Sequence, residues 1–166
     1  TTMCPTELGY DASVPPSLRL LPIETRLQTQ SLAEWRVKTD RWQVIPLDVG
    51  NADQIAKALE KVAEVRKVSL DTARALGFWH DDLADENPVR DSEGMVEVPM
   101  WRHALINIPH PLLKQGLVIL DTPGLNAVGA EPELTVNLIP QAHAVVFILS
   151  ADTGVTRSDL SIWREH

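Results

Sequence analysis

The feature that most constrains the fold is a pair of fully apolar runs, LVIL at residues 117–120 and AVVFIL at residues 144–149. Runs without polar alternation are typical of strands that a sheet buries on both faces. The segment between the two runs contains PELTVNLIPQA, which favours a short helix that ends near Pro140. Two buried strands with an intervening helix predict an α/β sheet with helices on both sides.

The first apolar run leads directly into a carboxylate, because Asp121 follows it and Gly124 comes three residues later. A carboxylate at the carboxyl end of a buried parallel strand lies where α/β sheets place their ligands. Hydrated Mg²⁺ is a suitable partner, since this ion takes one or two carboxylates and keeps several waters. A glycine leaves its backbone amide open to close approach by an anion such as phosphate. The alternative is an ordinary Asp-containing turn, because Pro-Gly pairs are common in turns.

The residues before these runs predict helices. Ser31 and Glu34 have the spacing of a capping box, which favours a helix in SLAEWRVKTDRW. The Pro- and Gly-containing stretch QVIPLDVG then breaks the helical pattern. Asn51 is placed to cap a long helix through about Leu76, and Gly77 is placed to end it.

Shorter segments predict strands and loops. LRLLPI at residues 18–23 favours a short strand. MVEVPM and HALINI, between residues 95 and 108, favour two strands or one strand broken at Pro99. PHPLLKQG predicts a turn, and the Pro- and Thr-rich residues 1–17 predict a loop.

Composition excludes several classes of protein. The 166 residues carry a formal net charge of −8, which argues against DNA or RNA as a partner and against a polybasic membrane patch. The single cysteine, Cys4, excludes an internal disulfide and a metal site built from cysteines, and a reducing cytosol is the simplest compartment. Cys4 has no evident activating partner, so a catalytic thiol is not expected.

Three motifs carry a family resemblance. LVILDTPG resembles the Asp-x-x-Gly motif of translation-factor-like GTPases. AHAVVFILSADTGVTRSD resembles the next strand and loop of the dynamin-like GTPases, and TTMCPT resembles their switch I, a Thr-x-x-Pro pattern. The order of these motifs is that of the family, and a large insert before the Asp-x-x-Gly strand is typical of bacterial members.

The resemblance implies a P-loop NTPase (Ras-like) α/β fold, a three-layer sheet that is incomplete here. It places a helical insertion between switch I and the Asp-x-x-Gly strand. The expected organisation is one partial GTPase domain over residues 1–166, with a switch I loop at 1–17, a mainly helical insertion at about 24–92, and the sheet core with switch II at about 95–166.

The resemblance also implies roles for individual residues. Thr2 falls on the catalytic threonine that coordinates Mg²⁺ and helps to place the attacking water, with Thr1 and Thr6 as alternatives, and Pro5 falls on the switch I proline. Asp121 would hold Mg²⁺ through water. Gly124 would contact the γ-phosphate. The residues that would shape switch II are Thr122, Pro123 and Leu125, and Thr122 and Pro123 count with Asp121 and Gly124 as the predicted nucleotide-binding residues.

The sequence departs from the family in two motifs. It has no Gly-Lys pair and therefore no Gly-x-x-x-x-Gly-Lys-Ser/Thr P-loop, and it has no Asn/Thr-Lys-x-Asp guanine motif. VKTD at residues 37–40 mimics the latter, but it has Val in the first place and precedes Asp121. We expect the P-loop before Thr1 and the guanine motif after His166. The strand before the P-loop would then lie between the two apolar runs, and each run would present a bare edge here.

The resemblance implies hydrolysis of GTP with Mg²⁺ by a cytoplasmic, membrane-peripheral parent protein that remodels membranes. Its partners would be guanine nucleotide, a second GTPase head, and membrane through regions outside these residues. The 166 residues alone are not expected to bind GTP usefully. Two alternatives stay open: a non-enzymatic interaction module derived from a degenerate GTPase domain, and another P-loop GTPase such as a ribosome-assembly type, which the long insert disfavours.

Overall fold

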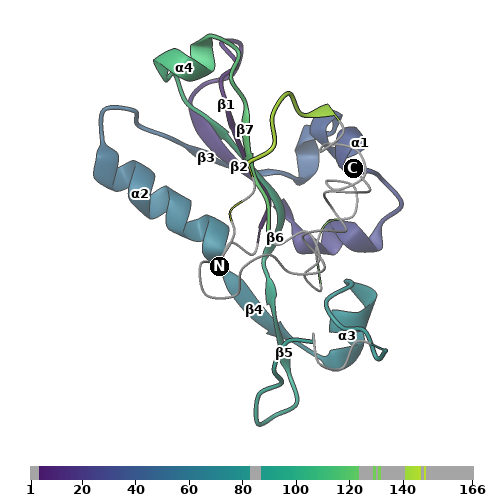
Figure 1. The fold of residues 1–166 in the computed structure, drawn as a ribbon. Coiled ribbons are helices and arrows are strands. Elements are labelled where there is room, and N and C mark those ends of the chain that lie inside the picture. Colours follow the sequence, from purple (N-terminus) through teal and green to yellow (C-terminus); the bar gives the residue numbers. More distant parts are fainter. Residues whose placement is uncertain are drawn as a thin grey trace. The chain divides into compact units, whose positions relative to one another are not determined.

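The computed structural model describes residues 4–82, 87–123, 129, 131, 141–146 and 148. The chain divides into two compact units, Thr1–Ala130 and Glu131–His166. All helices and strands given below lie in the first unit. Within the described residues, five strands form one sheet in the order β3-β2-β6-β1-β7 (Figure 1). These strands are β1 (Thr6–Gly9), β2 (Ser17–Pro22), β3 (Gln43–Pro46), β6 (Trp101–Asn107) and β7 (Ile119–Asp121).

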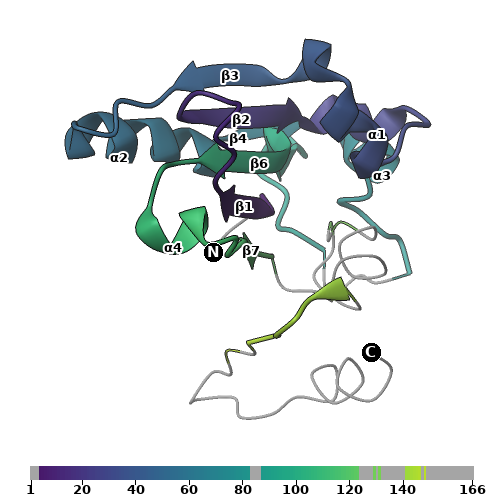
Figure 2. The same cartoon turned by 90° about the horizontal axis from the view of Figure 1, so that it is seen from above.

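The sheet is mixed, since β1 runs parallel to β6 while the other pairings are antiparallel. Strand β6 lies in the middle and is buried at every position except Ile106. On one side Leu20 of β2 is opposite Ala104, and on the other side Thr6 of β1 is opposite the same residue. Figure 2 shows the strands stacked in this order.

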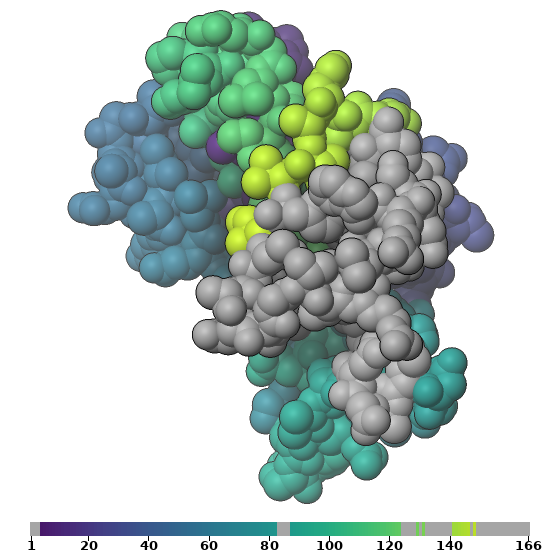
Figure 3. Space-filling view, viewed as in Figure 1, coloured from purple at the N-terminus to yellow at the C-terminus, as the bar shows by residue number. Residues whose placement is uncertain are grey.

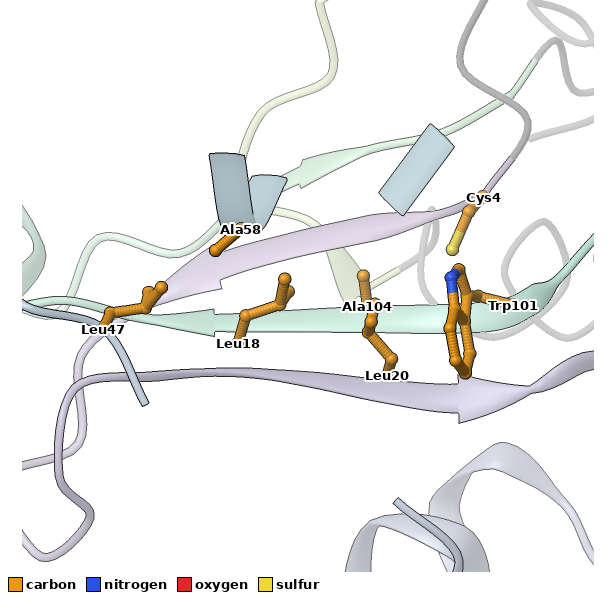
Figure 4. Packing of buried hydrophobic residues seen from close by; sticks show 7 residues of the cluster. All are labelled: Cys4, Leu18, Leu20, Leu47, Ala58, Trp101 and Ala104. Carbon is orange, nitrogen blue, oxygen red and sulfur yellow. The ribbon is translucent and has the colours of Figure 1, made fainter. Parts of the chain in front are cut away.

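One face of the sheet carries the main hydrophobic core. Leu18 and Leu20 from β2, with Ala104 from β6, pack against Ala58 of helix α2 (Ala52–Glu60). The remaining members of this cluster are Cys4, Leu47 and Trp101. Figure 4 shows the Cys4 sulfur directed toward the Trp101 ring. Burial of a leucine side chain such as Leu18 or Leu20 stabilises the fold by roughly 1.5–3 kcal/mol.

Helix α1 (Leu32–Val37) begins as the sequence predicts. The Ser31 hydroxyl accepts a hydrogen bond from the Glu34 amide, and the Glu34 carboxylate accepts one from the Ser31 amide, so the predicted capping box is confirmed. The helix ends at Val37 and is followed by a 3-10 helix, η2 (Thr39–Arg41). Another 3-10 helix, η1 (Ile23–Leu27), follows β2.

The prediction of one long helix through Leu76 is wrong. Asn51 does cap α2, but that helix ends at Glu60. The structure continues with η3 (Lys61–Ala63), β4 (Val65–Val68) and α3 (Leu70–Ala75). Strand β4 pairs antiparallel with β5 (Val96–Pro99). The pairing partner is distant in sequence and overrides the local helical spacing.

The small β4–β5 sheet has a core of its own. Its valines pack against α3 and the residues that follow that helix, in a cluster of Ile23, Val68, Ala73, Leu76, Phe78, Val96 and Val98. Figure 1 shows α3 beside β4 and β5. Gly77 ends α3 with a φ of +80°, a conformation that glycine adopts at little cost, so its predicted role is confirmed.

Five other local predictions can be compared with the structure. The LRLLPI strand is confirmed as β2, and the two strands around Pro99 are separate, as β5 and β6. The stretch QVIP forms the edge strand β3 rather than a break, because an edge strand tolerates Pro46. Residues 6–9, expected to be loop, form β1, and the predicted turn before β7 contains a short helix, α4 (Pro111–Lys114).

Strand β7 differs most from expectation. The sequence predicts a strand covered on both faces, yet Val118 is 58% exposed and Ile119 is 47% exposed. Among the described residues, β7 pairs with β1 alone and forms the edge of the sheet. The surface around α4 and β7 is the green area in Figure 3. The second predicted strand falls on residues 144–149, of which 144–146 and 148 are described, and these four have no regular structure.

Candidate functional site

The candidate site begins at Asp121, the last residue of β7. The strand forms because LVIL is apolar and finds β1 as a partner, with Ile119 opposite Leu8 and Leu120 opposite Glu7. This pairing ends at Asp121, whose side chain is exposed. The position of Asp121 at a strand end agrees with the prediction, but the strand is an exposed antiparallel edge strand and not the buried parallel strand that the sequence predicts.

Thr6 is the residue directly opposite Asp121 in the antiparallel pairing of β1 and β7. Side chains at directly opposed positions lie on the same face of a sheet, with Cβ atoms about 4.5–5.5 Å apart. The Thr6 side chain is half-buried, and its hydroxyl donates a hydrogen bond to the Cys4 carbonyl at 3.0 Å. The pairing therefore places Thr6, the last residue of TTMCPT, opposite Asp121, the first residue of the Asp-x-x-Gly motif.

The chain before Thr6 is anchored in the core. The Pro5 carbonyl accepts a hydrogen bond from the Ala104 amide at 2.9 Å, and Cys4 is fully buried. Burial raises the pKa of the Cys4 thiol to about 12. A thiol with that pKa stays protonated near neutral pH, so it is a poor nucleophile, in agreement with the prediction. Cys4 and Pro5 thus act as an anchor for Thr6.

The other predicted site residues are placed unevenly. Thr122 and Pro123 follow β7, are half-buried and have no helical or strand structure. Thr2, the predicted catalytic and metal-binding residue, lies outside the described residues, as do Thr1, Gly124 and Leu125. Of the three candidate threonines, the structure therefore describes Thr6 alone and places it opposite Asp121.

The donor atoms at this edge are oxygens, which suit a hard cation. Asp121 offers an exposed carboxylate and Thr6 a hydroxyl from the neighbouring strand. Mg²⁺ binds proteins through one or two carboxylates and keeps several waters, so these two residues fit its needs. Within the described residues there is no group of three or more His, Cys, Asp or Glu side chains that could hold a metal ion.

The position of Thr6 opposite Asp121 was not predicted from the sequence. The sequence favours Thr2 as the metal-binding threonine, because it matches the family motif residue by residue. The pairing partner of each threonine depends on strand β1, and TELG has a weak strand signal because Glu and Gly are depleted in strands. The available signal was the Leu at position 8, which with Thr6 gives the alternation of a half-buried strand.

An α/β domain with a mixed sheet and an Asp-x-x-Gly motif at a strand end is the kind of domain that a nucleotide-dependent switch protein contains. A sequence model of the Dynamin family matches residues 1–166. The chain therefore belongs to the dynamin family.

Two curated relatives show local similarity. The chain is 35% identical over 54 residues to a bacterial dynamin-like protein of Nostoc punctiforme, an alignment that covers 32% of this chain and 8% of the relative. It is 40% identical over 58 residues to a probable transmembrane GTPase, FZO-like, chloroplastic, of Arabidopsis thaliana, which covers 34% of this chain and 6% of the relative. The alignments thus span less than a tenth of either relative. No solved structure matches the chain.

The helices of the described residues include none that is long and apolar enough to cross a membrane.

Proposed function

We propose that the protein containing this chain binds GTP with Mg²⁺ and hydrolyses it. Membership of the dynamin family supports GTP and Mg²⁺ as the ligands. The observation that carries the proposal is the register of β1 and β7, which sets Thr6 beside Asp121 at the end of an edge strand. These are the two segments that the family resemblance assigns to the metal and the γ-phosphate.

These residues would contribute to the reaction by positioning charge. Phosphoryl transfer needs little covalent help from the protein, and most catalysis comes from oriented donors and a metal that neutralise the phosphate oxygens. Mg²⁺, when bound, supplies that positive charge. Asp121 would orient the ion, and a switch I threonine, Thr2 or Thr6, would hold it and help to position the attacking water.

The outer edge of β7 supports a larger nucleotide-binding domain. Among the described residues β7 has one strand neighbour, and Val118 and Ile119 are exposed although they are apolar. An edge of this kind readily accepts another strand. We propose that the strand preceding a P-loop occupies it in the complete protein, with the guanine motif supplied by the chain after His166. Under this proposal the domain comprises a switch I segment, an insertion and a sheet core with switch II, at the boundaries given above.

Substitution in the complete protein tests the proposal. Asp121→Ala should lower steady-state phosphate release by roughly 10²-fold or more, as expected when a positioned charge is removed. Thr2→Ala and Thr6→Ala, compared side by side, should show which threonine holds the metal. Asp40→Ala is the matched control, because Asp40 is an exposed carboxylate on η2 and should leave the rate unchanged. Wild-type rates in all three site variants would refute the assignment and favour a non-enzymatic module.

Binding by the isolated chain is a second test. The sequence has no P-loop lysine, and Asp121 repels a triphosphate unless a metal bridges them. Calorimetric titration with Mg²⁺ and GTP should therefore give no micromolar binding to these 166 residues. A dissociation constant in the micromolar range or tighter would show that the site is already complete. Peripheral membrane binding and pairing of GTPase heads are further parts of the proposal, assigned to the complete protein.

A further inference from the structure

Gly129, eight residues after Asp121, lies against the ring of Phe78. A Cβ atom built on Gly129 would come within 2.1 Å of Phe78 Cδ1, a distance that no real side chain tolerates. The backbone φ of Gly129 is +86°, in the region that favours glycine. Phe78 follows α3 and is 5% exposed, so the ring belongs to the core of the small β4–β5 sheet. Both the space and the backbone conformation therefore require glycine at this position.

Arg26 of η1 contacts both partners. Its guanidinium carbon lies 4.7 Å from the centroid of the Phe78 ring, within cation–π range. Its Nη2 donates a hydrogen bond to the Gly129 carbonyl at 2.8 Å, and its Nη1 donates one to the Leu76 carbonyl at 3.2 Å. A planar guanidinium can stack on a ring and donate from its edge at the same time, which a lysine ammonium cannot do.

These contacts join three parts of the chain that are distant in sequence. Arg26 comes directly after β2 of the large sheet, Phe78 comes from the small sheet, and Gly129 follows the Asp-x-x-Gly motif. The backbone carbonyl of Gly129 is bonded whatever its side chain, so the contact fixes the path of the main chain. Ordinary core packing of Phe78 would need neither the bond to Gly129 nor a glycine there.

We propose that Arg26, Phe78 and Gly129 form a clamp that fixes the chain downstream of Asp121 to the insertion, so that the insertion and the switch II motif are conformationally coupled. The three are positioning residues and touch no reacting group. The catalytic meaning of the clamp rests on the proposed GTPase function, whereas its existence as a coupling device does not. A change in the path of the motif would then be transmitted to α3 and the β4–β5 sheet through Phe78.

Hydrogen exchange on this chain without nucleotide tests the clamp. Arg26→Met keeps much of the side-chain bulk but removes the charge and both hydrogen bonds. We expect amide exchange in the peptides that contain Asp121 and Gly129 to accelerate about tenfold or more, since local opening sets these rates. The peptide covering β2 should be unchanged. Arg74→Met is the control, because Arg74 lies on α3 but bonds to Asp71 and Asp81 at the surface.

A double-variant cycle makes the test independent of whether Arg26→Met folds. Gly129→Ala should accelerate exchange around Asp121 about tenfold in the wild-type background but only about two- to threefold in the Phe78→Ala background, since contacting residues are non-additive. The two- to threefold acceleration that remains in the Phe78→Ala background reflects the strain of an alanine at the positive φ of position 129. Additive effects of the two substitutions, or unchanged exchange around Asp121 and Gly129 in a folded Arg26→Met variant, would overturn the clamp.

Phosphate release by the complete protein separates the clamp from the proposed function. If the clamp couples the insertion to the switch II motif, Arg26→Met should lower kcat more than it raises KM, and Arg26→Lys should not restore kcat. If Asp121→Ala abolishes turnover while the exchange cycle is additive, the clamp is wrong and the GTPase function stands. If the cycle is non-additive in a protein that does not turn over GTP, the clamp stands and the function is wrong.

Discussion

Strands β6 and β7 belong to the same sheet, but their apolar side chains have different surroundings. Strand β6 has a neighbour on each side, β2 and β1, and is buried at six of its seven positions. Within the part of the chain that the structure describes, β7 pairs with β1 alone, and Ile119 is 47% exposed. The sequence predicts a strand for both segments, and both form one. Their burial differs because it depends on whether a neighbouring strand or helix is present to cover them.

The polar residues of β6 and β7 differ in burial as well. In β6 the polar side chains of Arg102, His103 and Asn107 are almost completely buried. In β7 the polar residue is Asp121, which is exposed at the strand end. The centre of the sheet thus supports the fold, and the edge presents the candidate chemistry. The following substitutions test that division of roles.

The largest expected difference is between Leu20→Ala and Ile119→Ala. Leu20 is fully buried in the cluster beneath α2, so its truncation should lower the free energy of unfolding by about 3 kcal/mol. Ile119 is half exposed, and its truncation should cost less than about 1 kcal/mol. Urea unfolding followed by far-UV circular dichroism measures both. Equal costs would show that β7 is as firmly packed as the centre, and the comparison would fail.

Asn107 tests how the centre of the sheet holds the loop between β1 and β2. Its amide nitrogen donates to the Val14 carbonyl at 2.8 Å, and its amide oxygen accepts from the Asp11 amide at 2.7 Å. Asn107→Ala leaves these loop groups without their partner, and we expect a loss of about 2 kcal/mol in unfolding free energy. Asn51→Ala, at an exposed helix cap, is a comparison in which about 1 kcal/mol is expected. A smaller loss for Asn107→Ala than for Asn51→Ala would contradict the role of the buried amide.

His103 gives the stability of the sheet centre a dependence on pH. Burial, together with Arg36 and Arg102, lowers the pKa of His103 from 6.5 to about 3. Between pH 6.5 and 3 only the unfolded state binds the proton, so the free energy of unfolding falls as the pH falls, by about 1 kcal/mol per pH unit. Above pH 6.5 both states are neutral at this residue, and no dependence is expected.

His103→Leu should remove the part of the pH dependence of the unfolding free energy that His103 causes, measured between about pH 6 and about pH 4.5. Neither ring nitrogen of His103 has a hydrogen-bond partner among the described residues, so the substitution leaves no broken bond. Carboxylates with lowered pKa, such as Asp91 beside Lys67, titrate at lower pH and in both proteins alike. Urea midpoints across this pH range provide the measurement. Identical slopes in the two proteins would mean that His103 is not the group responsible.

Local sequence predicted those elements whose determinants are themselves local. The capping box at Ser31, the Asn51 cap and the Gly77 stop each depend on a few neighbouring residues, and all three are present. The helix expected through Leu76 failed because β4 is specified by its pairing with β5 and by the shared core with Phe78. Such contacts leave no trace in the hydrophobic spacing of one segment.

In the candidate site, too, some features follow from local sequence and others depend on pairing between distant segments. The position of Asp121 at a strand end follows from the apolar run before it, and the structure agrees. The choice among Thr1, Thr2 and Thr6 depends on strand register, which is set by pairing between distant segments. The exposure of Val118 depends on whether another strand covers it, which the composition of one strand does not encode.

Hydrogen exchange of the chain as a monomer, checked by light scattering, tests whether β7 is an open edge while β6 is the protected centre of the sheet. We expect strong protection in β2 and in Ala104 to Ile106 of β6, and weak protection in residues 118–120, which include the first two residues of β7, with a difference of about a hundredfold or more in exchange rate. Monomeric protein with equally strong protection in residues 118–120 and 145–149 would contradict it. The apolar runs would then form a complete sheet on their own, and β7 would have no edge left to offer to the rest of a nucleotide-binding domain.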